Sequence, residues 1–301
     1  MTSPTTHADR VPASVLVLAG IVSVQFGGAL AQSLITGTSI GAGGVVVMRL
    51  VFATALLLLL VRPRWRGHSR QAWLTVGAFG VALGLMNYTF YASLQHLPIG
   101  VAVTIEFLGP LALAAVLSRR VTDFLAVGAA GVGVVLISHA LRTPLAELPW
   151  AGLGLALTAG ACWAAYIVLS GRTGRAFDKL EGLALAMVVA TVVTLPLGVG
   201  SIPRWDVGSI LKGLGIAILS SVLPYSLELL ALRRMSAKVF GILLSLEPAV
   251  AALAGLLILS QHLAWDQLLG MALVVGASAL IMGTSRRPAE ETPGDLTETG
   301  G

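Results

Sequence analysis

Apolar stretches of about twenty residues follow one another along almost the whole chain, separated by short polar breaks. Ten can be delimited, at residues 12–34, 42–61, 72–95, 98–117, 123–138, 150–170, 180–199, 207–232, 237–259 and 265–284. A bilayer core about 30 Å thick is crossed by roughly 20 helical residues, so each stretch has about the length of one crossing. The alternating pattern of a barrel strand is missing. The sequence therefore predicts an all-α polytopic membrane protein with ten transmembrane helices.

Composition supports a lipid environment, because the chain is 56% hydrophobic and 11% charged and its mean hydropathy is +0.90. The residues ALAQ at 29–32 resemble a signal-peptide cleavage site. The apolar stretch around them is longer than a typical signal-peptide core, so we expect the first helix to be retained. Residues 1–11 and 285–301 are polar and are predicted to be short cytoplasmic ends.

The distribution of cations predicts the orientation, because Lys and Arg accumulate in cytoplasmic loops. With the amino terminus inside, fifteen of the nineteen cationic residues fall on the cytoplasmic side. Arg142, Arg204 and Lys212 fall outside, and Arg49 lies within a span. The sequence thus predicts that both termini are cytoplasmic. The pI of 9.9 follows from this topology and does not indicate nucleic-acid binding.

A weak internal repeat relates the two halves of the chain at an offset of 138 residues, which lays Pro110 on Pro248 and Gln25 on Trp163. Five is an odd number of spans, so the second half would enter the membrane from the opposite side. We therefore expect two inverted five-helix repeats, at 12–140 and 148–284. Inverted repeats around a midplane site are typical of carriers that expose one site alternately to either face.

Four stretches carry a resemblance to a known family: GVAVTIEFLGPLALA (100–114), GACWAAYIVLSG (160–171), LPYSLELLALRRM (223–235) and FGILLSLEPAVAALAG (240–255). They resemble the threonine and homoserine exporters of the EamA-type drug/metabolite transporter superfamily. The resemblance implies an exporter of small amino acids and analogues in the bacterial inner membrane, acting as an antiporter that uses protons as the coupling ion. The same superfamily contains carriers of other metabolites and of drugs, which is the alternative reading.

Four ionisable residues fall inside predicted spans: Arg49, Glu106, Glu228 and Glu247. A charge at the bilayer centre is costly, so such groups face a cavity or a partner. Arg49 and Glu106 lie at similar depth, roughly 10 to 12 Å from the outer face at 1.5 Å per residue. They can form a structural ion pair, or they can hold the carboxylate and the ammonium of a zwitterionic substrate. The other residues predicted to line this substrate site are Gln25, Asn87, Tyr91, Trp163 and Tyr225.

Glu247 and Glu228 are the candidates for proton coupling. Glu247 has no evident cation at its depth, which favours reversible protonation, although a protonated packing residue is the alternative. Glu228 lies within a turn or two of Arg233, so an arginine-paired structural carboxylate is the alternative there. Pro110 and Pro248 remove amide donors beside the two acids at 106 and 247, and we expect helix bends at both.

Other function classes find little support in the sequence. The five histidines lie outside the predicted spans without metal-ligand spacing, and Cys162 is the single cysteine. We therefore predict no metal site and no cofactor, and a membrane-embedded enzyme remains a remote alternative. The sequence does not indicate the oligomeric state.

Overall fold

The computed structural model describes residues 11–118, 121–137, 147–178, 180–224, 227, 231 and 243–284. Within these residues the chain is helical and contains no strand. The helices are α1 (Ala13–Gly37), α2 (Gly41–Val61), α3 (Arg70–Ser93), α4 (Ile99–Glu106), α5 (Leu108–Ser118), α6 (Val121–Ile137), α7 (Trp150–Ala176), α8 (Glu181–Gly198), η3 (Val199–Arg204), α9 (Val207–Ala217), η4 (Ile218–Val222), α12 (Glu247–Leu259) and α13 (Trp265–Thr284).

Five of the described helical segments are long and apolar enough to cross a membrane: Ala13–Gly37, Gly41–Val61, Arg70–Ser93, Trp150–Ala176 and Glu181–Arg204. The other described apolar helices are shorter. Apart from one or two residues at the end of α5 and the start of α6, each lies within a stretch that the hydrophobic pattern predicts as a span. The chain is thus a multi-pass helical membrane protein.

Some helix boundaries differ from those predicted. The stretch predicted to end at 170 continues as α7 to Ala176, so Arg172 and Arg175 lie on its last turns and not in a loop. The stretch predicted at 98–117 is interrupted at Phe107, where α4 ends and α5 begins. The parts of the predicted spans at 138, 225–226, 228–230, 232 and 237–242 lie outside the described residues.

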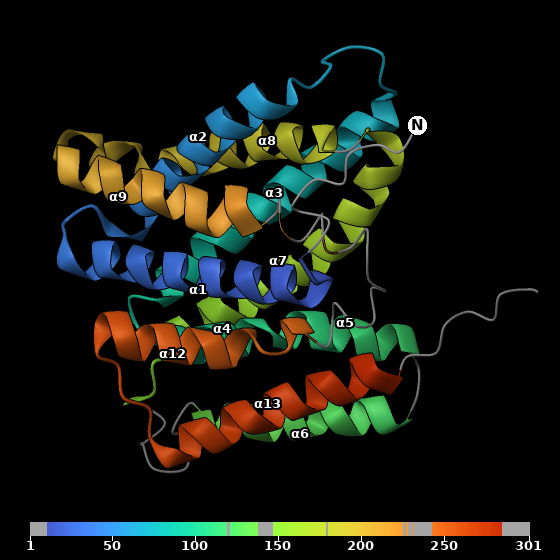
Figure 1. Ribbon diagram of the computed structural model, residues 1–301, viewed down its shortest axis with the longest axis vertical. Helices are drawn as coiled ribbons and strands as arrows, with labels where there is room; N and C mark the ends of the chain where they lie inside the picture. Colours follow the sequence, from blue (N-terminus) through green and yellow to red (C-terminus); the bar gives the residue numbers. More distant parts are fainter. Residues whose placement is uncertain are drawn as a thin grey trace, which may run out of the picture.

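The helices pack in pairs across the molecule. In Figure 1, α6 and α13 lie side by side at one edge, and α2 and α8 lie at the other. Between them α1 contacts α9 and α12, α4 contacts α12, and α7 contacts α3, α4 and α5. Among the described helices, those that lie around the middle of the bundle are therefore α1, α2, α3, α4, α7 and α12.

Glycines allow these helices to approach closely. A Cβ on Gly133 of α6 would lie 2.6 Å from the carbonyl oxygen of Gly270 of α13, and a Cβ on Gly270 would equally meet the carbonyl of Gly133. At the contact of α2 with α8, a Cβ on Gly43 would meet the carbonyl of Leu197, and a Cβ on Gly198 would meet the carbonyl of Gly43. Small residues at helix interfaces are the usual means of packing in membranes, where apolar burial alone does not drive association.

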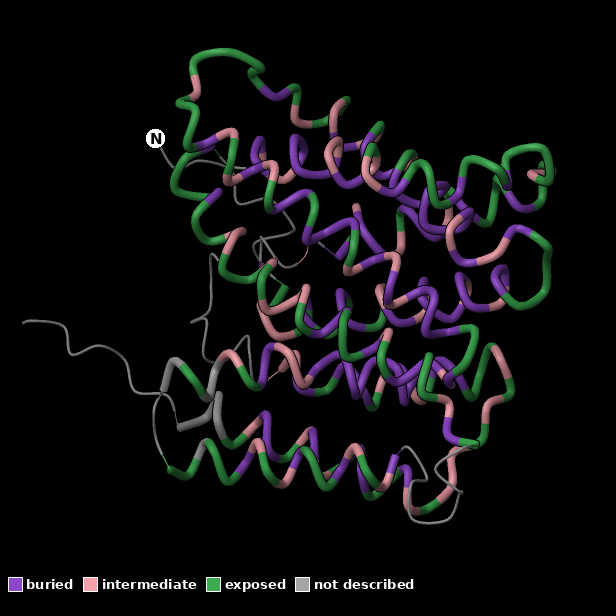
Figure 2. Tube along the Cα trace, turned by 180° about the vertical axis from the view of Figure 1, so that it is seen from behind, coloured by how far each residue is buried: buried purple, intermediate pink, exposed green. Residues whose placement is uncertain are grey.

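Large apolar side chains cover the outer faces of the bundle, as expected where helices contact lipid. Figure 2 shows buried positions toward the middle and exposed ones toward the periphery. Leu59, Leu60, Val121 and Leu125 are all at least 68% exposed, and Trp265 is 86% exposed at the start of α13. Tryptophan at helix ends is typical of the membrane interface.

Candidate functional site

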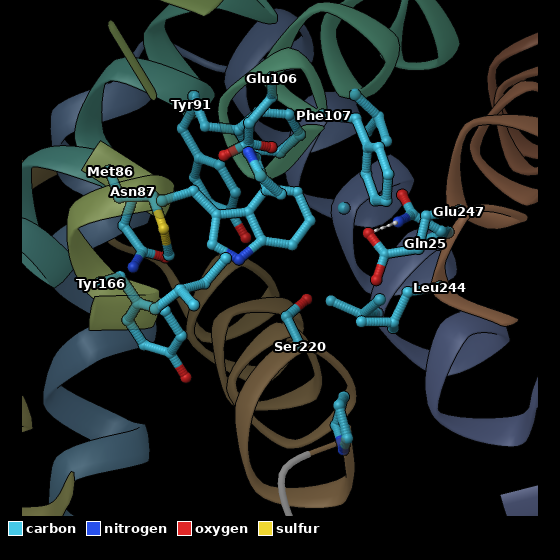
Figure 3. Close-up of a pocket in the computed structure, with 18 of the residues that line it drawn as sticks. Gln25, Met86, Asn87, Tyr91, Glu106, Phe107, Tyr166, Ser220, Leu244 and Glu247 are labelled. Atoms are coloured by element: carbon cyan, nitrogen blue, oxygen red, sulfur yellow. Dashed lines mark hydrogen bonds between the residues drawn. The ribbon is translucent and has the colours of Figure 1, made fainter. Parts of the chain in front are cut away.

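A cavity of about 450 Å³ opens in the middle of the bundle. It contains six of the seven residues predicted to bind substrate: Gln25, Arg49, Asn87, Tyr91, Glu106 and Trp163. In Figure 3, Glu106, Tyr91 and Asn87 lie on one side of this cavity and Gln25 and Glu247 on the other. Residues from α1, α2, α3, α4, α7 and α12 thus meet at one place, although they are as far apart as 222 positions in sequence.

Arg49 is fastened to the cavity wall by three hydrogen bonds. Its Nη1 donates to the Tyr91 hydroxyl at 3.1 Å and its Nε to the Ser221 hydroxyl at 3.2 Å. Its Nη2 donates to the carbonyl of Ser220 at 2.8 Å. The guanidinium carbon also lies 5.4 Å from the centre of the Tyr91 ring, within the range of a cation–π interaction. A buried guanidinium is stabilised in this way by neutral acceptors.

Glu106 is buried at the last position of α4 and lines the same cavity. The direct ion pair with Arg49, one of the two alternatives that the sequence offered, is not formed. In the part of the chain that the structure describes, the ion pairs within 4.0 Å join Arg64 to Asp178 and to Glu181. The reason is that the guanidinium is held by Tyr91 and by the turn at 220–221. The guanidinium of Arg49 and the carboxyl group of Glu106 therefore both line the cavity without pairing directly with each other.

Glu247 lies across the cavity as the first residue of α12. Gln25 of α1 donates through Nε2 to Oε2 of Glu247 at 3.5 Å, and the dashed line in Figure 3 marks this contact. Pro248 follows directly, and residues 245–246 before it form a turn, so the acid sits at a helix start. The predicted coupling residue is thus buried against α1 beside the cavity. Glu228 and Tyr225 lie outside the described residues.

Aromatic side chains form much of the remaining wall. Trp163 of α7 packs edge-on against Phe107, with ring centres 5.4 Å apart, and Tyr166 packs against Phe79 at 5.1 Å. Met86, Phe107, Tyr166, Ser220 and Leu244 line the cavity although the sequence did not single them out as substrate-binding. Four of the five are apolar or aromatic. Within an apolar span, the sequence does not distinguish such residues that line a cavity from those that pack in the core.

A second, smaller pocket of about 140 Å³ continues from the first along α7. Tyr166 and Ser170 line both pockets, and the smaller one extends to Phe177 and Gly182 at the far end of α7 and the start of α8. The cavity is thus extended toward the end of the bundle where α7 finishes. Among the described residues there is no group of three or more His, Cys, Asp or Glu side chains arranged to hold a metal ion.

An all-helical membrane protein with a cavity between its helices that is lined by ionisable side chains has the architecture of a carrier. The model of the EamA-like transporter family matches residues 150–283. The chain is 40% identical over 267 residues to the threonine/homoserine exporter RhtA of Escherichia coli strain K12, covering 88% of this chain and 89% of that protein. It is 38% identical to RhtA of Salmonella typhimurium strain SL1344, covering 89% and 90% of the two chains.

The chain therefore belongs to the EamA-like transporter family, and it is a transporter and not an enzyme. A solved crystal structure of another protein shares the fold, with a TM-score of 0.60 at 19% identity, covering 90% of this chain and 98% of the other. At this identity the likeness concerns the fold alone. The resemblance that four sequence stretches carried is confirmed at the level of the family.

Proposed function

We propose that this chain exports small amino acids such as threonine and homoserine across the bacterial inner membrane, coupled to protons. The names of its relatives support the substrate class, because the RhtA proteins are threonine/homoserine exporters. The observation that carries the proposal is the cavity itself, which offers a guanidinium and a carboxylate that do not pair directly with each other.

A zwitterionic amino acid fits this arrangement of charge. A guanidinium has five N–H donors, and the three hydrogen bonds of Arg49 leave one further N–H on each terminal nitrogen. Two parallel donors match the geometry of a carboxylate. The Glu106 carboxylate then accepts the substrate ammonium, while Asn87 and Tyr91 complete the polar wall. Trp163 and Phe107 contact the aliphatic part.

Alternating access requires two halves that move against each other, and the helix pairing supports two inverted repeats at 12–140 and 148–284. At an offset of 138 residues, α2 corresponds to α8 and α6 to α13, and each of these helices packs on its own counterpart. Gly133 and Gly270, which meet reciprocally, are 137 positions apart. A pseudo-twofold axis in the membrane plane would pass through such contacts.

The cation distribution supports loading from the cytoplasm. The smaller pocket ends at Phe177 and Gly182, next to Arg172 and Arg175 and close to the Arg64–Asp178 ion pair. Arginine is enriched on the cytoplasmic side of membrane proteins. With both termini in the cytoplasm, substrate enters along α7 and is released on the side of the 94–98 turn.

The coupling role of Glu247 is tested by Glu247→Gln in vesicles that contain the purified protein. A glutamine keeps the size and the contact with Gln25 but cannot release a proton. We expect the variant to lose accumulation of threonine driven by a pH gradient and to keep exchange of labelled for unlabelled threonine. If it still concentrates threonine at the rate of the unchanged protein, Glu247 is not the coupling group. The matched control is Glu181→Gln, outside the cavity.

The substrate class is tested by export from cells that contain or lack the protein. Cells are loaded with threonine, homoserine or an unrelated cationic drug, and efflux is followed at equal protein abundance. Faster efflux of the two amino acids, lost in Arg49→Ala, is the expected result. Faster efflux of the drug alone would assign the chain to the other carriers of its superfamily.

A further inference from the structure

The helix that begins at Val207 changes register beside the cavity. It is an α-helix to Ala217 and then a π-turn over Ile218–Val222, in which the amide of Leu223 bonds to the carbonyl of Ile218. Pro224 follows at once and lines the cavity. Single π-turns inside helices are rare and are frequent at functional sites.

This geometry removes from two neighbouring carbonyls the amide donor that α-helical register would give them. In α-helical register the amide of Leu223 would donate to the carbonyl of Leu219, but here it donates to the carbonyl of Ile218. The carbonyl of Ser220 would take its donor from residue 224, which is a proline and has no N–H. Buried carbonyls of this kind must find other partners.

Side chains of two other helices supply the missing donors. The hydroxyl of Ser23 on α1 donates to the carbonyl of Leu219 at 2.7 Å, and Nη2 of Arg49 on α2 donates to the carbonyl of Ser220 at 2.8 Å. The hydroxyl of Ser221, in the same turn, accepts from Nε of Arg49 at 3.2 Å. Two of the three hydrogen bonds on the guanidinium therefore end on one π-turn.

We propose that Pro224 and Ser221 are positioning residues, which aim the guanidinium of Arg49 at the substrate carboxylate by presenting the Ser220 carbonyl and the Ser221 hydroxyl as fixed acceptors. An arginine side chain has several rotatable bonds, and a guanidinium held at two of its three nitrogens by one turn keeps a single direction. The inference rests on the proposed binding of a substrate carboxylate at Arg49. It adds the residues that fix the orientation of the Arg49 guanidinium.

The test is Pro224→Ala, which gives residue 224 an amide that competes for the Ser220 carbonyl. Transport is measured with purified protein in vesicles for threonine and for threonine amide, which lacks the carboxylate. The loss of one hydrogen bond from Arg49 should raise the KM for threonine about three- to tenfold. The KM for the amide should stay within twofold. In a background of Arg49→Lys, Pro224→Ala should have no further effect on the KM for threonine.

Ser221→Ala should shift the two KM values in the same selective way. The matched control is Pro196→Ala, which changes a proline inside α8 that does not line the cavity, and it should leave the ratio of the two KM values unchanged. An equal rise for threonine and for the amide in Pro224→Ala would overturn the proposal, since a general packing defect acts on both. An unchanged KM for threonine would overturn it as well.

A structure of the Pro224→Ala variant checks the positioning without any substrate. We expect the new amide to bond to the Ser220 carbonyl and Nη2 of Arg49 to move beyond hydrogen-bond distance from it. An unmoved guanidinium would overturn the proposal even if transport changed. A wild-type protein that transports neither compound would instead refute the proposed function, so that the two failures are distinguishable.

Discussion

Three prolines stand four residues after a residue that lines the cavity. Pro110, Pro224 and Pro248 remove the amide donors of the carbonyls of Glu106, Ser220 and Leu244. Arg49 bonds to the second of these carbonyls. Gly160 of α7 packs against the first so closely that a Cβ there would lie 2.6 Å from its oxygen. Backbone that departs from the regular helix at this depth is tolerated where protein or a watery cavity receives it.

Glu106 can be changed without breaking an ion pair, because it makes none within 4.0 Å in the described structure. Glu106→Gln should therefore reach the membrane at normal abundance and lose the charged acceptor for the substrate ammonium. A hydrogen bond to a charged group contributes about 1.5 to 3 kcal/mol, so the KM for threonine should rise roughly ten- to hundredfold. Vesicle transport and quantitative immunoblotting measure the two quantities. A variant with unchanged KM would remove Glu106 from the binding site.

Sequence reasoning found the ionisable and polar residues of the site because a charge or an amide in an apolar span stands out. It expected Arg49 and Glu106 to meet, since their depths match. Depth along two helices does not determine the direction of a long side chain. Three neutral acceptors, one from α3 and two from the π-turn, determine where the side chain of Arg49 points. The sequence feature that could have indicated this contact is the serine pair at 220–221 followed by Pro224. A proline leaves the carbonyl four residues earlier without its helical amide donor, so that this carbonyl can accept from a side chain.

At the scale of helices, the hydrophobic pattern predicted where spans lie better than where each helix begins and ends. The pattern follows lipid contact, whereas a helix can continue beyond the apolar region as long as its residues favour it. α7 does so to Ala176. The interruption at Phe107 also leaves the hydrophobic pattern unchanged, since the residues on both sides are apolar. Pro110 indicated a bend in this segment but not its position.

The start of α9 is capped by a reciprocal pair of hydrogen bonds. The carboxylate of Asp206 accepts from the amide of Ser209 at 2.8 Å, and the hydroxyl of Ser209 accepts from the amide of Asp206 at 2.9 Å. The hydrogen bonds from Ser209 hold the pKa of Asp206 below its ordinary value of 3.8. A lowered folded pKa means that the ionised cap stabilises the folded state at neutral pH, and this contribution is lost as the pH falls through the folded pKa.

Asp206→Ala should accordingly lower the melting temperature at pH 7, and its difference from the unchanged protein should shrink as the pH falls below about 4. Asp206→Asn is the matched control, because asparagine caps a helix nearly as well and does not titrate. Thermal unfolding of the purified protein between pH 3 and pH 7 measures both. A deficit in the alanine variant that does not depend on pH would show that the charge of Asp206 contributes nothing.

A network of two glutamines lies near one end of the cavity. Gln32 of α1 donates through Nε2 to the carbonyls of Leu94 and Leu97, at 2.8 and 3.0 Å, and accepts from Gln261 at 3.1 Å. Gln261 in turn accepts from the amide of Ile99 at 3.1 Å. Gln32 lies four residues beyond Gly28 and Ile99 four residues before Val103, and both Gly28 and Val103 line the cavity. The network is thus one helical turn beyond the cavity.

Opening of the cavity at this end should require the glutamine network to break. Gln261→Ala removes two of its hydrogen bonds, each of about 0.5 to 1.5 kcal/mol, and should make the open state about five- to hundredfold more populated. The measurement is the rate at which an impermeant thiol reagent, added on that side, modifies Met86→Cys in a Cys162→Ser background. Gln267→Ala, at the start of α13, is the control. An unchanged rate in Gln261→Ala would show that the network does not limit opening.

For the molecule as a whole, the distribution of cations and the spacing of apolar stretches were enough to predict a multi-pass helical protein, since the bilayer imposes both. The close pairing of α6 with α13 and of α2 with α8 could not be read from them. These contacts depend on single glycines, such as Gly133 and Gly270, that look like any others in a sequence with 35 glycines.

The orientation of the bundle is tested by single cysteines at opposite ends of α2, in a Cys162→Ser background. Arg66→Cys lies in the loop after α2, and Ser39→Cys lies before it, and both positions are exposed. Gly67 is avoided because its φ of +91° would strain any other residue. Because the loop at 62–70 carries four arginines, we expect an impermeant reagent to modify Ser39→Cys in intact cells and Arg66→Cys only after lysis. Modification of Arg66→Cys in intact cells would reverse the orientation, and with it the assignment of the α7 pocket to the cytoplasmic entrance.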